Sequence, residues 1–288
     1  MTYGTGNQPQ FAVAADVNGD NKLDIIVANL WGNSVSVFLN KGNGTFASQA
    51  MYPAMIAPIS VTAGDVNGDN KLDIIVANYG SHNVGVLLNN GDGTFTPQVT
   101  YPAGNTTNSV VTVDVNGDNK LDIIASNSVS NDVSVFLNNG DGTFASHVTY
   151  PTGNTPRSVT TADVNGDSKA DIIVANMGSN NVRVLLNNGN GIFTSQITYS
   201  TGFSPYSVTT ADINGDSKLD LVVANAGSNY ISVLRGNGNG TFAAQVTYST
   251  VSSSSMVVAT DVNGDSLVDI IFMSTSSNSV GVLLAACN

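Results

Sequence analysis

A five-residue motif, Asp-x-Asn-Gly-Asp, occurs six times in this sequence, and consecutive copies always begin 49 residues apart. The copies begin at Asp16, Asp65, Asp114, Asp163, Asp212 and Asp261. Six full periods would need only six residues more than the 288 that the chain has. A short repeat cannot bury its apolar face alone, so neighbouring copies have to stack. We therefore expect one repeat domain over residues 1–288 and not two unrelated domains.

Each repeat has the pattern of four short strands. In the second repeat we expect the strands at Ile59–Gly64, Ile74–Asn78, Val84–Leu88 and Thr94–Tyr101. The second of these is an uninterrupted apolar run, typical of a strand that is covered on both faces. Residues 89–93, Asn-Asn-Gly-Asp-Gly, predict a hairpin turn with glycines where a positive φ is needed. Four antiparallel strands in ~45 residues make one propeller blade, so the sequence predicts an all-β, six-bladed β-propeller.

The two ends of the sequence fit together as parts of one repeat. Met1-Thr2-Tyr3 aligns with Val99-Thr100-Tyr101, the end of a fourth strand, and the last repeat stops after its third strand. The N-terminal segment is therefore expected to complete the last blade and to close the ring, which would cover an open sheet edge. The alternative is that the sequence was cut from a longer array of repeats.

The charge of the chain is concentrated in the repeated motifs. All 21 acidic residues are Asp, and 18 of them belong to the six motifs. Nine Lys and Arg are too few to pair them, and the net charge of -12 excludes nucleic-acid binding through a basic face. No apolar run approaches the ~20 residues that cross a bilayer, and no signal peptide is evident after Met1. The single cysteine, Cys287, permits no disulfide within the chain.

The loop after the first strand of each repeat carries oxygen-bearing side chains at fixed positions. Positions 1, 5 and 9 are Asp and position 3 is Asn in every copy, whereas position 7 varies, as a residue that offers only its backbone carbonyl can. Such an oxygen cage suits Ca²⁺ better than Zn²⁺. Without a cation, two carboxylates ~4 Å apart repel each other by about 4 kcal/mol at an effective dielectric constant of ~20. An EF-hand is excluded, because Val76 stands where its bidentate Glu would be.

We expect one Ca²⁺ in each blade, about six in all, whose charge would neutralise that of the chain. The alternative is an acidic turn in which Asp and Asn only cap backbone N–H groups. The expected side-chain ligands are Asp16, Asn18, Asp20, Asp24, Asp65, Asn67, Asp69, Asp73, Asp114, Asn116, Asp118, Asp122, Asp163, Asn165, Asp167, Asp171, Asp212, Asn214, Asp216, Asp220, Asp261, Asn263, Asp265 and Asp269. The residues expected to contribute a backbone carbonyl are Lys22, Lys71, Lys120, Lys169, Lys218 and Leu267.

This pattern resembles the FG-GAP/VCBS repeat of integrin α-subunit propellers and of many extracellular bacterial and invertebrate proteins. The Asp-rich loop, the Ile-Ile-Val-Ala-Asn strand and the Asn-Gly-x-Gly-x-Phe turn carry the resemblance, which covers essentially the whole chain. It implies a calcium-binding propeller in an extracellular or cell-surface setting. The family includes adhesion receptors, lectins and accessory domains of polysaccharide-active enzymes. A similar family of fungal lectins binds N-acetylglucosamine between blades, a likeness that extends only to the fold.

Differences between the repeats are concentrated in two places. One is a position just before the first strand, which reads Gln10, Ile59, Asn108, Arg157, Tyr206 and Ser255. The other is the loop between the second and third strands, which holds the only Trp of the chain. In an up-and-down blade both lie on the face opposite to the calcium loops. Aromatic rings beside amide and guanidinium donors suit sugars, so the expected glycan-binding residues are Trp31, Tyr79, His82, Arg157, Tyr206 and Tyr230.

Three classes of function fit this pattern to different degrees. We expect first a lectin-like or adhesion propeller that is not an enzyme and that binds glycans as a monomer on the variable face. The alternative is an integrin-type protein-binding module. The variable residues could also be solvated loop tips that drifted after duplication. An enzyme ranks third, because the chain has no Glu, its Asp residues are committed to the loops, and His82 and His147 occupy non-equivalent positions. Neither nucleic acid nor insertion into a membrane is expected.

Overall fold

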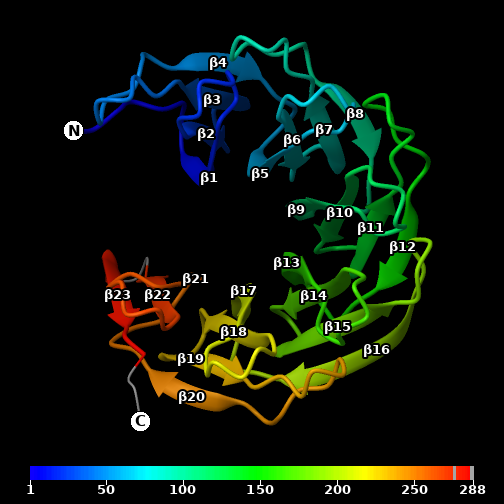
Figure 1. Ribbon diagram of the computed structural model, residues 1–288, viewed down its shortest axis with the longest axis vertical. Helices are drawn as coiled ribbons and strands as arrows, with labels where there is room; N and C mark the ends of the chain where they lie inside the picture. The colour runs from blue at the N-terminus through cyan, green and yellow to red at the C-terminus, as the bar shows by residue number, and fades with distance from the viewer. Residues whose placement is uncertain (275–276, 286–288) are drawn as a thin grey trace. The chain divides into compact units, whose positions relative to one another are not determined.

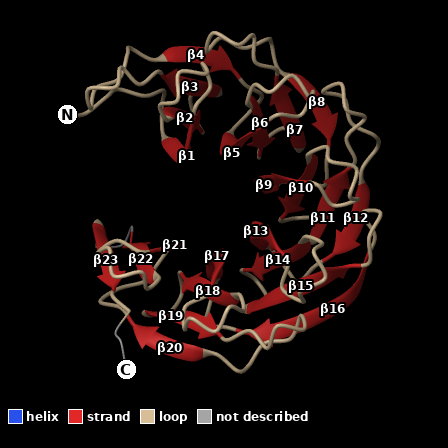
Figure 2. Ribbon diagram, in the orientation of Figure 1, coloured by secondary structure: helices blue, strands red, loops and turns tan. Residues whose placement is uncertain are grey.

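The computed structural model describes residues 1–274 and 277–285. The regular secondary structure of these residues consists of β-strands alone (Figure 1 and Figure 2). The chain divides into two compact units, Met1–Tyr150 and Pro151–Asn288. Each unit contains three antiparallel sheets, and each sheet corresponds to one repeat. The fold class is that of a six-bladed β-propeller, as the period of the sequence predicts, and the sheets are its blades.

The three sheets of the first unit have four strands each, and the strands lie side by side in chain order. The first sheet contains β1 (Pro9–Ala15), β2 (Asp24–Asn29), β3 (Ser34–Phe38) and β4 (Ala50–Pro53). The second contains β5 (Pro58–Gly64), β6 (Asp73–Asn78), β7 (Asn83–Leu87) and β8 (Val99–Pro102). The third contains β9 (Thr107–Val113), β10 (Asp122–Asn127), β11 (Asp132–Phe136) and β12 (Val148–Pro151), whose last residue marks the boundary of the unit.

The second unit repeats this plan, with one difference in its last sheet. The fourth sheet contains β13 (Pro156–Ala162), β14 (Asp171–Asn176), β15 (Asn181–Asn187) and β16 (Phe193–Ser200). The fifth contains β17 (Pro205–Ala211), β18 (Asp220–Asn225), β19 (Tyr230–Leu234) and β20 (Val246–Ser249). The sixth contains β21 (Met256–Thr260), β22 (Asp269–Ser274) and β23 (Ser279–Leu283).

The expected fourth strand of the sixth blade is not assigned in the described residues, where that sheet has three strands. Residues 1–8 contain no strand either. Completion of the last blade by the N-terminal segment therefore stays a prediction.

The second strand of each blade forms the core, because its successive side chains pack against opposite neighbours. In β6, Ile74 and Val76 pack with the residues of the first blade, including Val35 and Val37. Ile75 lies in the next cluster, which contains residues of the third blade. All three β6 side chains are fully buried. Burying each such side chain contributes ~1.5–3 kcal/mol, which explains why this strand is apolar at every position between its polar ends.

The fourth strand of the second blade is shorter than the sequence predicts. β8 begins at Val99, and the five residues from Thr94 form only an isolated bridge, Asn89 to Phe95. The Thr96 hydroxyl accepts the Leu88 N–H at 3.0 Å, so a side chain takes the place of the backbone carbonyl and the ladder is interrupted there. The expected turn is confirmed, since Gly91 and Gly93 have φ values of 94° and 79°.

In three blades a tyrosine from the outer strand packs against the hairpin of the next blade. The Tyr52 and Phe95 rings meet edge to face at 5.3 Å, and Tyr199 meets Phe242 in the same way at 5.4 Å. Tyr3 occupies the corresponding place in the first blade, with its ring 5.6 Å from that of Phe46. The Tyr3 hydroxyl also accepts the Phe46 N–H at 3.0 Å. Tyr3 thus makes the contact that its alignment with Tyr101 suggests, although residues 1–8 form no strand.

Candidate functional site

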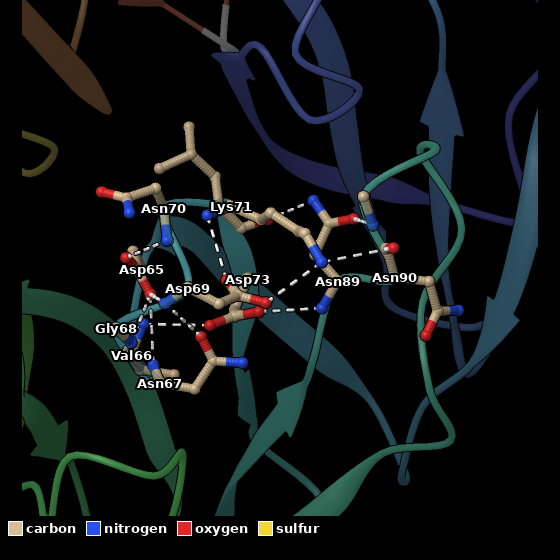
Figure 3. A network of polar contacts seen from close by, with 12 residues as sticks. Asp65, Val66, Asn67, Gly68, Asp69, Asn70, Lys71, Asp73, Asn89 and Asn90 are labelled. Carbon is tan, nitrogen blue, oxygen red and sulfur yellow. Dashed lines mark hydrogen bonds and ion pairs between the residues drawn. The ribbon is translucent and has the colours of Figure 1, made fainter.

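Six Asp loops join the first two strands of the blades, at residues 16–24, 65–73, 114–122, 163–171, 212–220 and 261–269. In the second loop the Asp65 carboxylate accepts the N–H groups of Gly68 and Asn70 at 2.7 and 2.8 Å (Figure 3). Gly68 and Asn70 have φ values of 76° and 61°, a region that suits these two residue types. Hydrogen bonds within the motif therefore hold the loop in this conformation, and the Asp65 carboxylate is their common acceptor.

The last Asp of the loop connects it to the hairpin of the same blade. Asp73 is fully buried, and its carboxylate accepts the Val66 N–H at 2.9 Å and the Asn89 N–H at 2.8 Å (Figure 3). The Asn89 side chain donates to the carbonyls of Leu72 and of Val17, both at 2.8 Å. Val17 belongs to the loop of the preceding blade, so this polar network joins two blades as well as two loops. The same pair of N–H bonds is present at Asp24, Asp122, Asp171, Asp220 and Asp269.

Burial raises the pKa of several of these carboxyl groups. It raises the pKa of Asp122 to about 6, and the nearby carboxylates of Asp118 and Asp114 act in the same direction. The N–H groups of Asn138 and Val115 partly oppose this rise in the pKa. Burial also raises the pKa values of Asp73, Asp171 and Asp220. These groups hold a proton more tightly than an exposed Asp does.

Lysine side chains accompany five of the six loops, contrary to the expectation that the carboxylates lack cationic partners. Lys71 Nζ lies 3.3 Å from Asp69 Oδ2, and it also donates to the Asn90 carbonyl of the hairpin at 3.4 Å. The separation from the position-5 Asp ranges from 2.9 Å at Lys22 to 3.9 Å at Lys218. These side chains are about two-fifths exposed, so each pair contributes only ~0–1 kcal/mol.

The chemistry of the Asp loops fits a hard cation. Each carboxylate oxygen has two lone pairs, so an N–H bond does not exhaust its capacity as an acceptor. Asp65, Asn67, Asp69 and Asp73, whose side chains gather beside the loop backbone in Figure 3, would hold Ca²⁺ through oxygen atoms alone. Among residues 1–274 and 277–285, no three Asp, His or Cys side chains are close enough, as they stand, to hold a metal ion together.

Two of the expected glycan-binding residues are exposed in loops of the first unit. Trp31, between β2 and β3, is 68% exposed, and Tyr79, between β6 and β7, is 38% exposed. These loops lie at the end of each sheet opposite to its Asp loop, because the strands are antiparallel. Both rings are accessible to a ligand.

His82 has a structural contact that its sequence position does not reveal. It has a positive φ of 56°, and its Nδ1 accepts the N–H of Thr106, which leads into the next blade, at 2.9 Å. Asn33 and Asn180, at the equivalent positions of other blades, accept a backbone N–H in the same way at 2.9 and 2.8 Å. His82 therefore replaces an Asn that links blades, and contact of its exposed ring with a ligand stays a prediction.

Arg157 and Tyr206 lie within strands, so the prediction that they precede the first strand is wrong. Each is the second residue of its strand, β13 or β17, at a point where the register with the following strand shifts. Such a bulge leaves one residue out of the ladder and re-aims its side chain. The Arg157 guanidinium lies 4.4 Å from the Tyr206 ring centroid, and its Nη2 donates to the Tyr206 hydroxyl. Two of the expected glycan-binding residues therefore contact each other directly.

Tyr230 is the first residue of β19, and its half-buried ring packs against Gly202. Trp31, Tyr79 and His82 belong to the first unit, whereas Arg157, Tyr206 and Tyr230 belong to the second.

A pocket of about 440 Å³, which the sequence did not predict, lies between the outer parts of the first two blades. Its lining is mostly apolar and comprises Tyr52, Pro53, Ala54, Met55, Leu87, Phe95, Thr96, Pro97 and Gln98. Gln98 Oε1 accepts the Met55 N–H at 3.0 Å, whereas Gln98 Nε2 is buried without a hydrogen-bond partner in the described part of the chain. The signal that could have revealed it is Met55, which replaces the Gly104 and Gly202 of other connectors.

Exposed apolar residues in the connectors between blades were also missed. Phe203, which precedes β17, is 66% exposed, and Ile56, at the equivalent place before β5, is 60% exposed. Other blades have Asn105 and Asn154 at this position. This variation was visible in the sequence, but it lies outside the two places that the analysis selected.

Comparison with protein families agrees with the geometry of the blades. The model of the FG-GAP-like repeat matches five overlapping segments, residues 16–76, 65–125, 114–174, 163–223 and 212–272. The chain belongs to the FG-GAP-like repeat family. No curated protein matches it. No helix in the described residues is long and apolar enough to cross a membrane.

Several solved structures resemble this FG-GAP-like propeller. A lectin of Agrocybe aegerita, described as recognising non-reducing terminal N-acetylglucosamine, is 26% identical over 93% of this chain and 75% of its own, with a TM-score of 0.66. The virginiamycin B lyase of Staphylococcus aureus is 14% identical over 96% of this chain and 84% of its own, with a TM-score of 0.64. The V. cholerae biofilm matrix protein Bap1 is 22% identical over 88% and 41%, with a TM-score of 0.53. The last two show the fold alone.

Proposed function

We propose that this protein is a calcium-stabilised, carbohydrate-binding propeller that acts outside the cell as a lectin or adhesion domain. The observation that carries the proposal is the likeness to the Agrocybe aegerita lectin, which extends over 93% of the chain at 26% identity. Virginiamycin B lyase has a similar fold, so the fold by itself does not separate lectins from enzymes. The family and the lectin together favour a protein that binds without catalysis.

Two places in the first unit suit a sugar. The pocket between the first two blades has apolar walls formed by Tyr52, Phe95 and Met55, and it has room for a monosaccharide. A rotation of the Gln98 side chain would let its Nε2, which is now buried against Gly85, donate to a hydroxyl or amide oxygen of that sugar. Trp31 offers an exposed ring on which the C–H face of a second sugar would stack. Several weak sites on one molecule would act together through avidity.

Calcium would stabilise the end of each blade opposite to the variable loops. When bound, Ca²⁺ would neutralise the carboxylates of an Asp loop. Asp73 already joins its loop to the hairpin, and Asn89 joins both to the preceding blade. A cation held by Asp65, Asp69 and Asp73 would therefore stabilise the network between blades without contacting a sugar at Trp31.

A protein ligand is the second candidate. Ile56 and Phe203 expose more than half of their surface on connectors, and large exposed apolar side chains favour protein contacts more than contacts with sugar hydroxyls. An integrin-type binding module would use such side chains.

Binding of glycans by the intact protein in calcium tests the proposal. A glycan array would identify the sugar, and calorimetry would then compare Trp31→Ala and Gln98→Met with the wild type. Loss of a stacking ring or of one buried hydrogen bond should weaken binding at that site by about tenfold, the equivalent of ~1.4 kcal/mol. Ile192→Ala is the control, since Ile192 is 51% exposed on a hairpin at the Asp-loop end. A broad array on which no sugar binds would overturn the proposal in favour of the protein ligand.

A further inference from the structure

The hairpins of four blades carry an Asn-Gly pair in the same place, which allows a close comparison. The pairs are Asn90–Gly91, Asn139–Gly140, Asn188–Gly189 and Asn237–Gly238, and all four Asn residues are exposed. Asn followed by Gly is prone to spontaneous deamidation, because glycine has no side chain to obstruct the attack of its own amide nitrogen on the Asn side chain. Sequence alone therefore assigns these four pairs the same reactivity.

The Asn side chains are held alike in three of the four hairpins, whereas the Asn188 Nδ2 donates to the hydroxyl of a more distant threonine, Thr194, at 2.6 Å. The Asn90 Nδ2 donates to a threonine hydroxyl at 2.9 Å, and those of Asn139 and Asn237 do the same at the same distance. The main-chain N–H of each also donates to the carbonyl of that threonine at 2.9 Å. Neither the sequence of the pair nor the position of the Asn distinguishes these sites.

The glycine nitrogen, which is the nucleophile of the reaction, does distinguish them. The N–H groups of Gly91, Gly140 and Gly189 donate to the side-chain oxygen of the Asn two residues earlier, at 2.7, 2.7 and 2.8 Å. In the fifth blade that earlier residue is Gly236, which has no side chain. Gly238 N–H makes no hydrogen bond among residues 1–274 and 277–285, and Gly238 is exposed whereas the other three glycines are half-buried.

We propose that Asn237 is a deamidation site of the folded protein, and that the equivalent Asn residues are protected. In the reaction the deprotonated Gly238 nitrogen bonds to Asn237 Cγ, the Cγ–Nδ2 bond breaks, and Nδ2 leaves as ammonia with the proton. Water then opens the succinimide at either carbonyl and gives Asp or isoaspartate, so one water is consumed for each ammonia released. A glycine N–H that is donating to a neighbouring carbonyl oxygen has to break that bond before it can react.

The product would change the surroundings of the fifth Asp loop. Gly238 lies against the aliphatic part of Lys218, and a Cβ built on it would be 3.2 Å from Lys218 Cγ. Lys218 Nζ is 3.9 Å from Asp216. Isoaspartate at position 237 would lengthen the backbone that leads to Gly238, beside the Asn237-to-Thr241 bond.

Peptide mapping by mass spectrometry tests the proposal on the full chain, incubated at mildly alkaline pH in calcium. Fragment ions are needed to separate Asn237 from Asn239 and Asn188 from Asn190, since all four are followed by Gly. The gain of about one dalton at Asn237 should be at least fivefold faster than the gain at Asn90, Asn139 and Asn188. That factor corresponds to the ~1 kcal/mol of one net hydrogen bond. In concentrated urea the four rates should become equal, because the protecting bonds are absent. Equal rates in the folded protein, or a slower rate at Asn237, would overturn the proposal.

A variant would remove the protecting hydrogen bond from the third blade. Asn138→Gly removes the oxygen that accepts Gly140 N–H, and Gly236 shows that glycine is compatible with this position of the hairpin. Deamidation of Asn139 should then accelerate toward the rate at Asn237, while Asn90 serves as an unchanged control in the same molecule. An unchanged rate at Asn139 in a folded variant would contradict the protecting role of the bond.

Discussion

Acid should stabilise the calcium-free protein and destabilise the calcium-loaded protein. The groups responsible are the buried carboxyls that end the Asp loops, of which Asp73, Asp122, Asp171 and Asp220 have raised pKa values. Burial is the largest cause in each case, because a charge is less stable away from water. In the unfolded chain these groups regain the pKa of an ordinary Asp.

The sign of the effect follows from which state holds the proton. The pKa of Asp122 is about 6 in the folded protein and 3.8 in the reference state. Between these values the folded chain binds more protons than the unfolded chain, so the free energy of unfolding falls as the pH rises. For Asp122 the full difference is about 3 kcal/mol, present below the lower pKa and lost above the higher one. Asp73, Asp171 and Asp220 act in the same direction.

Bound calcium reverses this dependence, since Ca²⁺ favours the ionised carboxylates and protons compete with it. Urea denaturation at about pH 5 and about pH 7.5 would measure both cases, with protein stripped of metal and with protein in excess calcium. The stripped protein should have the higher midpoint at the lower pH, and Asp122→Asn should reduce that difference. A stripped protein that becomes more stable as the pH rises would refute the reasoning about the buried carboxyls.

Three further predictions concern stability and can be checked by thermal or urea denaturation. Removal of calcium with a chelator should lower the melting midpoint by many degrees, because each site held at ~100 times its Kd contributes about 2.7 kcal/mol, and identical midpoints would exclude structural calcium. Tyr3→Ala should lower the free energy of unfolding by about 1–3 kcal/mol through loss of the ring contact with Phe46. Tyr3→Phe should lower it less, because only the hydroxyl that accepts the Phe46 N–H is lost; equal effects would show that the ring does not matter. His82→Asn should change stability by less than ~0.5 kcal/mol, whereas His82→Leu should cost about 1–2 kcal/mol by leaving Thr106 N–H without its acceptor, and the reverse order would refute the linking role.

The period of the sequence predicts the fold well because equivalent residues of the repeats are buried in equivalent contacts. The apolar run Ile74–Ala77 is buried on both faces by neighbouring blades, and a run of that kind between an Asp loop and a Gly-rich turn leaves few alternatives. The glycines of the hairpin turn are likewise fixed by their positive φ values. Features that depend on one residue in one blade are harder to predict.

The errors of the sequence analysis have identifiable physical origins. The bulge at Arg157 and Tyr206 inserts one residue into the ladder, and no residue type marks such a bulge in advance. The pairing of Lys71 with Asp69 does not follow from the motif, because the expected role of position 7 uses only its backbone carbonyl. The pocket depends on how the outer part of one blade meets the next, which the pattern within a single repeat does not contain.

The contacts between neighbouring blades explain why one end of each blade is constant and the other varies. At the Asp-loop end these contacts use side chains, since Asn89 donates to the Val17 carbonyl of the preceding blade. A substitution there breaks the contact. At the opposite end side chains such as His82 and Asn33 also take part, but the loop that contains Tyr79 is joined to the connector through the backbone, by the bonds from Tyr79 N to Ala57 O and from Gly80 N to Ile56 O. Any side chain that tolerates the local φ is compatible with those bonds. Residues such as Trp31 or Phe203 can therefore change without loss of the blade, and that freedom is what a surface needs in order to acquire a ligand.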